Sequence, residues 1–262
     1  MFELAATDGE PLNGGGCIVT GVLLFKGMQV GVLPGDFTIT VDESGAFKAN
    51  FILATAYNVL PLWLRIAHDE LNQARIASDA VGSKWGINAD ENCELLIAEL
   101  EPSLQVFVSC GIALDALYDQ LRPFANLSDQ DSKAWKTNRT ARESQIVEVI
   151  RRVFKLNPQM TAAFRKNISQ IFEFRNRGVH PSLELKRPCT RPDVPGGVDW
   201  KFSAYKYANA RICFEQTMYM IIHLYERKSE NGDVNNLLEN VVHTLEQLKV
   251  IHRTGEPGQP SI

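Results

Sequence analysis

The chain has 262 residues, of which 45% are hydrophobic and 22% charged, a composition close to that of globular proteins that excludes a wholly disordered chain. The amino terminus lacks a basic segment followed by an apolar one, so we expect no signal peptide. No apolar run approaches the roughly 20 residues that a membrane helix needs, and the longest candidate, 218–224, contains His223. These features predict a cytoplasmic protein without a membrane segment.

The cysteines are odd in number and scattered, at positions 17, 93, 110, 189 and 213, with no CxxC pair. This pattern favours a reducing compartment and speaks against a disulfide framework and a zinc knuckle. We expect neither a metal site nor a cofactor.

Charge is distributed unevenly along the chain. The net charge is −4, but the segment 133–191 contains fourteen Lys and Arg and only four acids, a local excess of +10 that leaves −14 for the rest. Such a segment is typical of a surface that binds a polyanion. The alternative is that these residues are spread over several solvated helix faces and pair with acids elsewhere. The spacing does not separate the two interpretations.

The first fifty residues have strand character. Residues 17–25 are rich in Val, Ile and Leu, and 14–16 form a short glycine lead-in. Apolar and polar residues alternate over 36–41, a turn follows at 42–45, and the alternation resumes at Phe47. This pattern predicts a β-hairpin, with another strand or two before it.

From Phe51 onward the pattern is helical. Pro61 opens or kinks a first helix, and 82–92 reads as a loop. Pro102 is placed at the start of a second helix, whose apolar stripe runs 107, 110, 114, 117 and 121 until Pro123 ends it. Residues 126–138 read as irregular, and Thr140 to Glu143 as a capping box that begins a helix reaching Asn157.

The carboxyl-terminal part continues with a helix over 159–177, a Pro/Gly-rich loop over 188–197, and two helices near 202–228 and 234–252. The stripe at 234, 238, 241, 245 and 248 alternates by four and three, which suits a short coiled coil or an ordinary packed helix. We therefore predict a mainly α fold, a bundle of about five helices over 54–254, with a small antiparallel β appendage over 1–53 and a disordered tail over 255–262.

The end of the 159–177 helix contains the most informative residues. Its apolar side chains share one face, and Arg175 falls near the middle of that face. A buried guanidinium is costly unless it is paired, so Arg175 either meets a buried acid or faces an interface or cleft. We expect Gly178 to end the helix and Pro181 to prevent its continuation, which frees the chain to swing His180 back toward Arg175.

An arginine and a histidine brought together on a basic surface suit cleavage of RNA. The histidine can accept the proton of a ribose 2′-hydroxyl, and the arginine can hold the phosphate oxygens. Asn176 is placed to orient either neighbour, and no cluster of carboxylates with metal-ligand spacing is visible.

Arg175-Asn176-x-x-x-His180 resembles the RX4–6H motif of the HEPN superfamily (higher eukaryotes and prokaryotes nucleotide-binding). Residues 110–118, a helix with small residues and the acid Asp115, look like an earlier helix of that family. The resemblance covers about 95–228 and implies a compact helical bundle and, in many members, a metal-independent endoribonuclease in toxin–antitoxin or anti-phage systems.

The resemblance also implies a homodimer whose active site combines two copies of the motif. Arg175, His180 and Asn176 would be catalytic and Asp115 supporting; Ser182 stands where some members have a tyrosine that a partner enzyme modifies. The surrounding basic residues would bind RNA: Arg151, Arg152, Arg177, Lys186 and Arg187. A toxin role would add an antitoxin or other regulatory partner.

Other interpretations stay open. Arg175 can instead be a structural residue bridged to Asp115 or Glu173, with His180 capping its own helix. The chain can be a non-catalytic HEPN module that binds RNA, nucleotide or a partner protein, or an interaction scaffold. The tyrosines at 205, 207, 219 and 225 can stack on bases or belong to the core.

Overall fold

The computed structural model describes residues 28–41, 45, 47–180, 185–253 and 260–261. The chain forms two compact units, Met1–Tyr57 and Asn58–Ile262. Two predictions, strands around 17–25 and the glycine lead-in at 14–16, lie outside the described residues, and so does most of the predicted tail.

The amino-terminal unit contains two antiparallel strand pairs. β2 (Phe37–Val41) pairs with β3 (Phe47–Phe51), which confirms the predicted hairpin. β1 (Met28–Gly31) pairs with β4 (Ala54–Tyr57), so strand structure continues beyond the expected end of the appendage at residue 53.

The second unit confirms a mainly α fold, but its described residues contain eight α-helices rather than about five. They are α1 (Leu60–Lys84), α2 (Ala89–Leu121), α3 (Asp129–Thr137), α4 (Arg142–Phe154), α5 (Pro158–Val179), α6 (Trp200–Ala204), α7 (Tyr207–Arg227) and α8 (Gly232–Gln247), with a 3₁₀ turn η1 (Arg122–Phe124) after α2. A hairpin of β5 (Cys189–Arg191) and β6 (Val194–Val198) precedes α6, and β7 (His252–Arg253) pairs with β8 (Pro260–Ser261).

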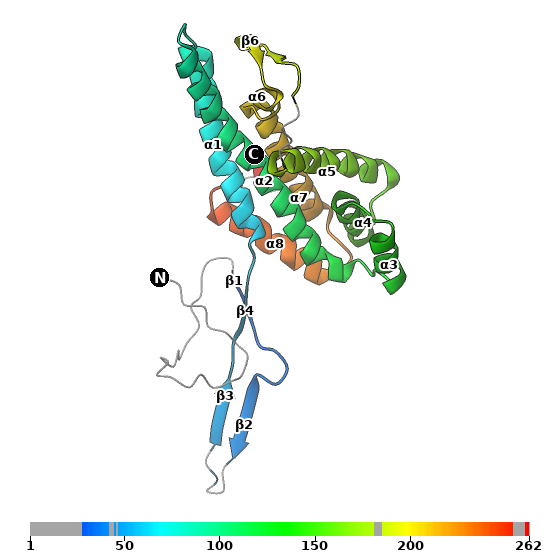
Figure 1. Cartoon of the computed structure of the whole chain (residues 1–262). Helices are drawn as coiled ribbons and strands as arrows, with labels where there is room; N and C mark the ends of the chain where they lie inside the picture. The colour runs from blue at the N-terminus through cyan, green and yellow to red at the C-terminus, as the bar shows by residue number, and fades with distance from the viewer. Residues whose placement is uncertain (1–27, 42–44, 46, 181–184, 254–259, 262) are drawn as a thin grey trace, which may run out of the picture. The chain divides into compact units, whose positions relative to one another are not determined.

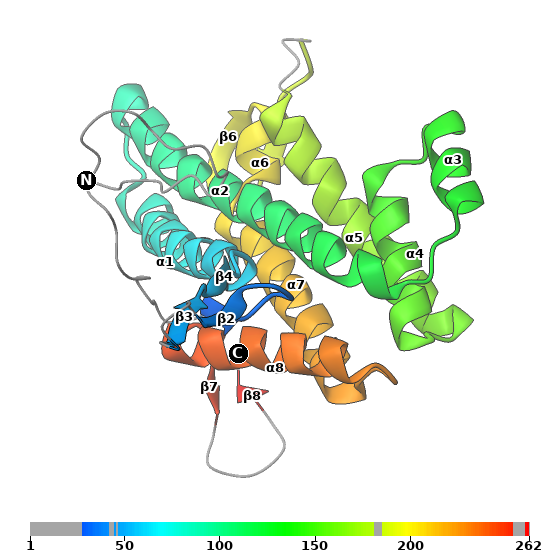
Figure 2. The same ribbon diagram turned by 90° about the horizontal axis from the view of Figure 1, so that it is seen from below.

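Helix α2 is the central element of this unit. It forms a helical hairpin with α1 and also contacts α4, α5 and α7, while α8 packs on α1 and α7 (Figures 1 and 2). One row of its buried positions alternates by three and four, namely 96, 99, 103, 106, 110, 113 and 117. This spacing keeps one seam of a helix against a neighbour along its whole length. The predicted stripe from Phe107 to Leu121 is accordingly buried.

The prediction that Pro102 begins a helix was wrong. The helix begins at Ala89, where the Asn88 side chain accepts a hydrogen bond from the Asp90 N–H, and Pro102 lies inside it. Proline removes one hydrogen bond from a helix interior, but the apolar seam on both sides of Pro102 packs against α1. Most of the loop predicted over 82–92 is consequently helical.

Helix α2 with η1 (Ala89–Phe124) is also long and apolar enough to cross a membrane. The sequence had predicted no membrane segment and had pointed to 218–224 as the longest apolar run. Half of its most apolar stretch is buried inside the bundle. A core helix of a soluble protein has the same length and composition.

Two local predictions around α3 and α4 were wrong. The segment 126–138 contains α3, where the Ser128 and Asp131 side chains form a capping box. The capping box predicted at Thr140 is absent, because α4 is preceded by Ala141 without a side-chain cap. Both sites fit the Ser/Thr-x-x-acid pattern, and only the tertiary surroundings select between them.

The segment 188–197 is a hairpin rather than the predicted loop, and a buried ion pair fastens it to α2. The Arg191 guanidinium donates to Glu99 of α2, to Asp193 and to the Phe202 carbonyl at 2.9 Å. The other Glu99 oxygen accepts the N–H of Tyr207 at 2.9 Å, at the start of α7. The side chains of Arg191 and Glu99 are each only 1% exposed.

Breaking this ion pair tests its structural role. Arg191→Met leaves the Glu99 carboxylate buried without its cation, so we expect the free energy of unfolding to fall by about 3 kcal/mol. The double variant Glu99→Leu/Arg191→Met removes the buried charge as well and should recover much of this loss. Urea denaturation measures both variants. A single variant as stable as the wild type would show that the pair is dispensable.

Candidate functional site

Helix α5 positions the motif that the sequence singled out. The Asn157 side chain accepts a hydrogen bond from the Met160 N–H and caps its start, and Pro158 occupies the first turn. The buried face of the helix consists of Thr161, Phe164, Ile168, Ile171 and Phe172. This face packs on α2 and α4, and Arg175 continues it toward the exposed end of the helix.

The Arg175 guanidinium is half-buried beside Asp115 of α2. One terminal nitrogen lies 3.9 Å from the Asp115 carboxylate, and the other donates to the Asn176 side-chain oxygen at 3.0 Å. The Nε atom is buried and has no hydrogen-bond partner within the described structure. Because protein atoms enclose this Nε, only the terminal nitrogens of Arg175 can donate to a further acceptor from outside the chain.

Gly111 of α2 makes room for the Arg175 side chain. A Cβ atom at position 111 would stand 3.0 Å from Cγ of Arg175 and 3.5 Å from its Cβ. The stem of the arginine therefore lies close to the backbone of α2, and any side chain at position 111 would require this stem to shift by a few tenths of an ångström. The small residues of this helix are visible in the sequence, but no sequence signal identifies Gly111 as the residue that lies beside Arg175.

Arg142 of α4 is a second cation at Asp115, and the sequence analysis missed it. Its Nε donates to Asp115 at 2.7 Å, its Nη2 donates to Asp119 at 3.0 Å, and its guanidinium lies 3.8 Å from the centre of the Tyr118 ring. The two acids offset the burial of this guanidinium, and the pKa of Arg142 stands above its ordinary value. Asp115 thus contacts Arg142 closely and Arg175 more loosely.

The expectation that Gly178 ends the helix was wrong. Helix α5 continues through Gly178 to Val179, and the His180 N–H still donates to the Asn176 carbonyl at 2.9 Å. A Cβ atom on Gly178 would stand 2.4 Å from Cδ1 of Leu104 in α2 and 3.4 Å from the Tyr205 hydroxyl. This glycine therefore permits close packing rather than a break.

Because the helix is unbroken, Arg175 and His180 do not meet within one chain. Five residues of α-helix separate two side chains by roughly 140° and about 7.5 Å along the axis. Arg175 faces α2, whereas His180 is exposed and its side chain has no partner in the described part of the chain. Within one chain, Arg175 forms the ion pair with Asp115 that the structural alternative predicts.

The residues expected to bind RNA are mostly engaged in ion pairs. Arg151 and Arg152 both bind Glu148, and Arg152 also binds Asp131 at 3.0 Å. Arg177 pairs with Glu173 on its own helix. Lys186 lies 5.1 Å from the centre of the Trp200 ring, and Arg187 is exposed.

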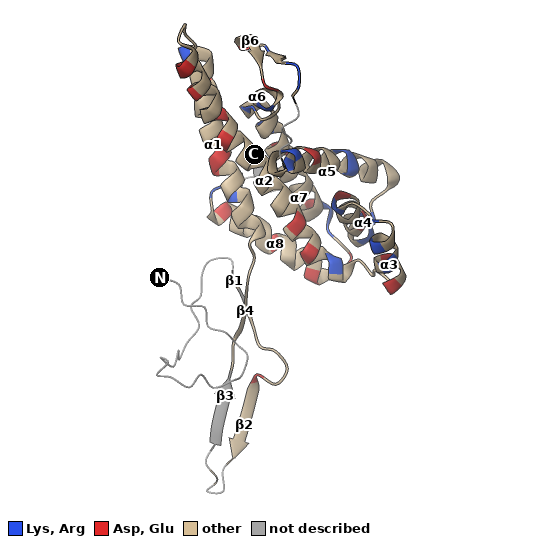
Figure 3. Cartoon of the chain, in the orientation of Figure 1, with Lys and Arg blue, Asp and Glu red and all other residues tan. Residues whose placement is uncertain are grey.

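The basic segment as a whole contains many neutralised charges. At least seven of its fourteen cations form ion pairs with acids in the described structure: Arg142, Arg151, Arg152, Lys155, Arg175, Arg177 and Arg191. Figure 3 shows basic and acidic residues interspersed along these helices. The interpretation of dispersed, paired charges therefore holds for at least half of the basic residues in this segment.

No group of three or more His, Cys, Asp or Glu side chains with the arrangement of a metal site occurs among the described residues. Ser182 and its neighbours lie outside them.

Comparison with protein family models, with curated proteins and with solved structures returned no match for this chain.

The contact between Gly111 and Arg175 gives a prediction with a matched control. Alanine normally stabilises a helix interior by about 0.5–1 kcal/mol relative to glycine. Gly82→Ala in α1, where the space is open, should show this gain, whereas Gly111→Ala should lose most or all of it because the Arg175 stem must move. Thermal and urea denaturation compare the two variants, and equal stabilisation would contradict the packing role.

Glu148 gives a pH prediction. Hydrogen bonds from Arg151, opposed by partial burial, and further bonds from Arg152 lower the pKa of Glu148 from 4.5 to about 2. The stabilisation is therefore complete above pH 4.5 and is lost as the pH falls toward 2. Glu148→Gln should reduce the acid-induced loss of stability by about 1–2 kcal/mol, after allowance for solvent screening. Urea midpoints from pH 6 to pH 2 test this, and parallel curves for both proteins would contradict it.

Proposed function

We propose that this chain is a metal-independent endoribonuclease of the HEPN type that acts in the cytoplasm as a homodimer. The observation that carries the proposal is the state of Arg175, a half-buried guanidinium held by the Asn176 side chain and more loosely by Asp115, on the same helix end as the exposed His180. A guanidinium held in this way is suited to a phosphate. A toxin or anti-phage role, with a neutralising partner protein, belongs to the same proposal.

The proposed site requires two copies of the chain. Because Arg175 and His180 lie on different faces of one α5, a complete site needs His180 from one copy beside Arg175 of the other. Val179 supports a contact at this helix end, since it is apolar and 46% exposed immediately before His180. A two-fold contact between such ends would form two equivalent sites.

The chemistry is a transesterification in which the ribose 2′-oxygen displaces the 5′-oxygen at phosphorus. The His180 imidazole accepts the proton of a ribose 2′-hydroxyl, and the 2′-oxygen attacks the adjacent phosphorus. The bond from phosphorus to the 5′-oxygen breaks, and that oxygen takes up a proton from an imidazolium or from water. The products are a 2′,3′-cyclic phosphate and a 5′-hydroxyl. Arg175 donates to the non-bridging oxygens as charge develops, with Asn176 holding its guanidinium.

The second candidate is a non-catalytic module that binds RNA, nucleotide or a partner protein. The ion pair between Arg175 and Asp115 favours it, because it gives the arginine a structural partner within one chain. RNA binding that persists in His180→Ala, with no cleavage by the wild type between about pH 5 and 9, would select this candidate.

Cleavage of generic RNA in EDTA tests the proposal. We expect Arg175→Ala and His180→Ala each to reduce the rate at least about 100-fold, as loss of a general base or a charge-stabilising group does. Arg165→Ala, exposed on the same helix, and His243→Ala, exposed on α8, are matched controls and should retain activity. Equal activity in all preparations, or none in the wild type, would refute the proposal.

Mixing the two inactive variants tests the composite site. An equimolar mixture of Arg175→Ala and His180→Ala chains, allowed to exchange subunits, forms hybrid dimers with one complete site out of two. Activity should return to about a quarter of the wild-type value for random pairing. Absence of recovery, with exchange verified by mass spectrometry, would contradict a site built from two copies.

A further inference from the structure

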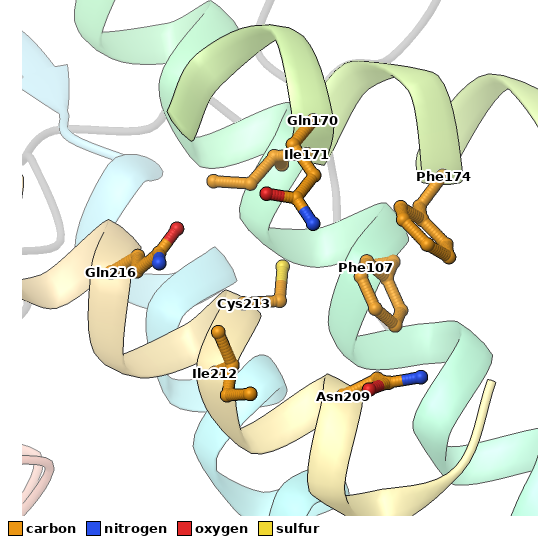
Figure 4. A pocket seen from close by; sticks show the side chains of 8 residues that line it. All are labelled: Phe107, Gln170, Ile171, Phe174, Asn209, Ile212, Cys213 and Gln216. Atoms are coloured by element: carbon orange, nitrogen blue, oxygen red, sulfur yellow. The ribbon is translucent and has the colours of Figure 1, made fainter. Parts of the chain in front are cut away.

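A pocket of about 90 Å³ opens between α2, α5 and α7 (Figure 4). A single water occupies roughly 10–15 Å³ of such space, so the pocket admits a group of about six to nine heavy atoms. That size suits one six-membered ring with its substituents. It is too small for a whole dinucleotide or a fused-ring cofactor.

One wall of the pocket is aromatic and rigid. The rings of Phe107 and Phe174 stack with centroids 5.1 Å apart and planes 19° from parallel. Tyr205 packs edge-on against both rings and donates its hydroxyl to the Phe174 carbonyl at 2.8 Å. Ile171 and the half-exposed Ile212 complete the apolar lining. A flat ring gains contact with such a wall without ordering it first.

Carboxamides supply the polar part of the lining. Gln170 from α5 and Gln216 from α7 lie on two sides of the opening in Figure 4, and neither side chain has a hydrogen-bond partner in the described structure. Asn209 is fixed, because its amide nitrogen donates to the carbonyls of Ser203 and Ala204. A carboxamide offers both a donor and an acceptor, as the edge of a nucleobase requires.

No Lys, Arg, Asp or Glu occurs among the described residues that line the pocket. Cys213, whose sulfur points into the pocket in Figure 4, is 4% exposed, and burial, with a hydrogen bond to Cys110, raises the pKa of its thiol. The thiol is therefore neutral at neutral pH and lines the pocket as an apolar group. A charged ligand would lose its hydration here without gaining a counter-charge, so the occupant is neutral.

We propose that this pocket binds a single-ring nucleobase, a pyrimidine, with its face toward Phe107 and Phe174 and its edge toward Gln170 and Gln216. A pyrimidine has the required size, neutrality and alternating donors and acceptors. The site lies outside the Arg175–His180 motif and binds the base whether or not the chain cleaves RNA.

Titration of the isotope-labelled full-length chain with uridine and cytidine, followed by NMR, tests the pocket. We expect saturable binding with a dissociation constant of roughly 1 mM or tighter, and weaker binding of adenosine and guanosine. Gln170→Leu and Gln216→Leu should each weaken binding between about twofold and tenfold, as the loss of one neutral hydrogen bond does. The His180→Ala variant should bind like the wild type, which separates this site from the proposed ribonuclease.

A blocking variant and its control complete the test. Ile212→Trp places an indole at the pocket opening and should reduce pyrimidine binding more than tenfold. Ile97→Trp on α2 lies outside the pocket and should leave binding unchanged. The two positions are matched in exposure, since Ile212 is 46% and Ile97 45% exposed. If circular dichroism shows that Ile212→Trp does not fold, Gln170→Leu and Gln216→Leu, which change exposed or half-exposed side chains, test the proposal in its place. Absence of pyrimidine binding, tighter purine binding, or unchanged binding in both glutamine variants would overturn the proposal.

Discussion

The close approach of α5 to α2 is the constraint on which the candidate site depends. Each helix contributes one glycine: Gly111 of α2 accommodates the Arg175 stem, and Gly178 of α5 accommodates Leu104. A side chain at position 111 would require the Arg175 stem to shift, and one at position 178 would require the Leu104 side chain to move. This contact sets the distance between Arg175 and Asp115, and it holds Phe174 against Phe107 and Tyr205 in the wall of the neighbouring pocket.

The same contact separates the two motif residues. Packing keeps α5 helical through Val179, so Arg175 remains on the face toward α2 while His180 is exposed at the end. Within one chain the arginine is a partner of Asp115, and the histidine is a surface residue. The proposed chemistry therefore depends on a second copy, and the oligomeric contact becomes part of the functional argument.

Many of the cations in the basic segment 133–191 are neutralised by ion pairs and are not available to bind a polyanion. The buried pair of Arg191 and Glu99 holds the β5–β6 hairpin and the start of α7 to α2, which is a structural task for one member of the basic segment. Arg151 and Arg152 are held by Glu148 and Asp131. A count of charges along the sequence overestimates the surface that can meet a polyanion, because ion pairs between distant segments do not appear in it.

The sequence by itself determined the mainly α class, the β2–β3 hairpin, and the buried faces of α2, α4, α5 and α8, because periodic burial is a local property of each segment. It also located Arg175 on an apolar face. Only the tertiary structure decided that Pro102 lies inside a helix, that Gly178 packs rather than breaks, and that Arg142 shares Asp115. These outcomes depend on which helices touch, and a glycine or proline with two permitted local roles takes the one that its neighbours in space require.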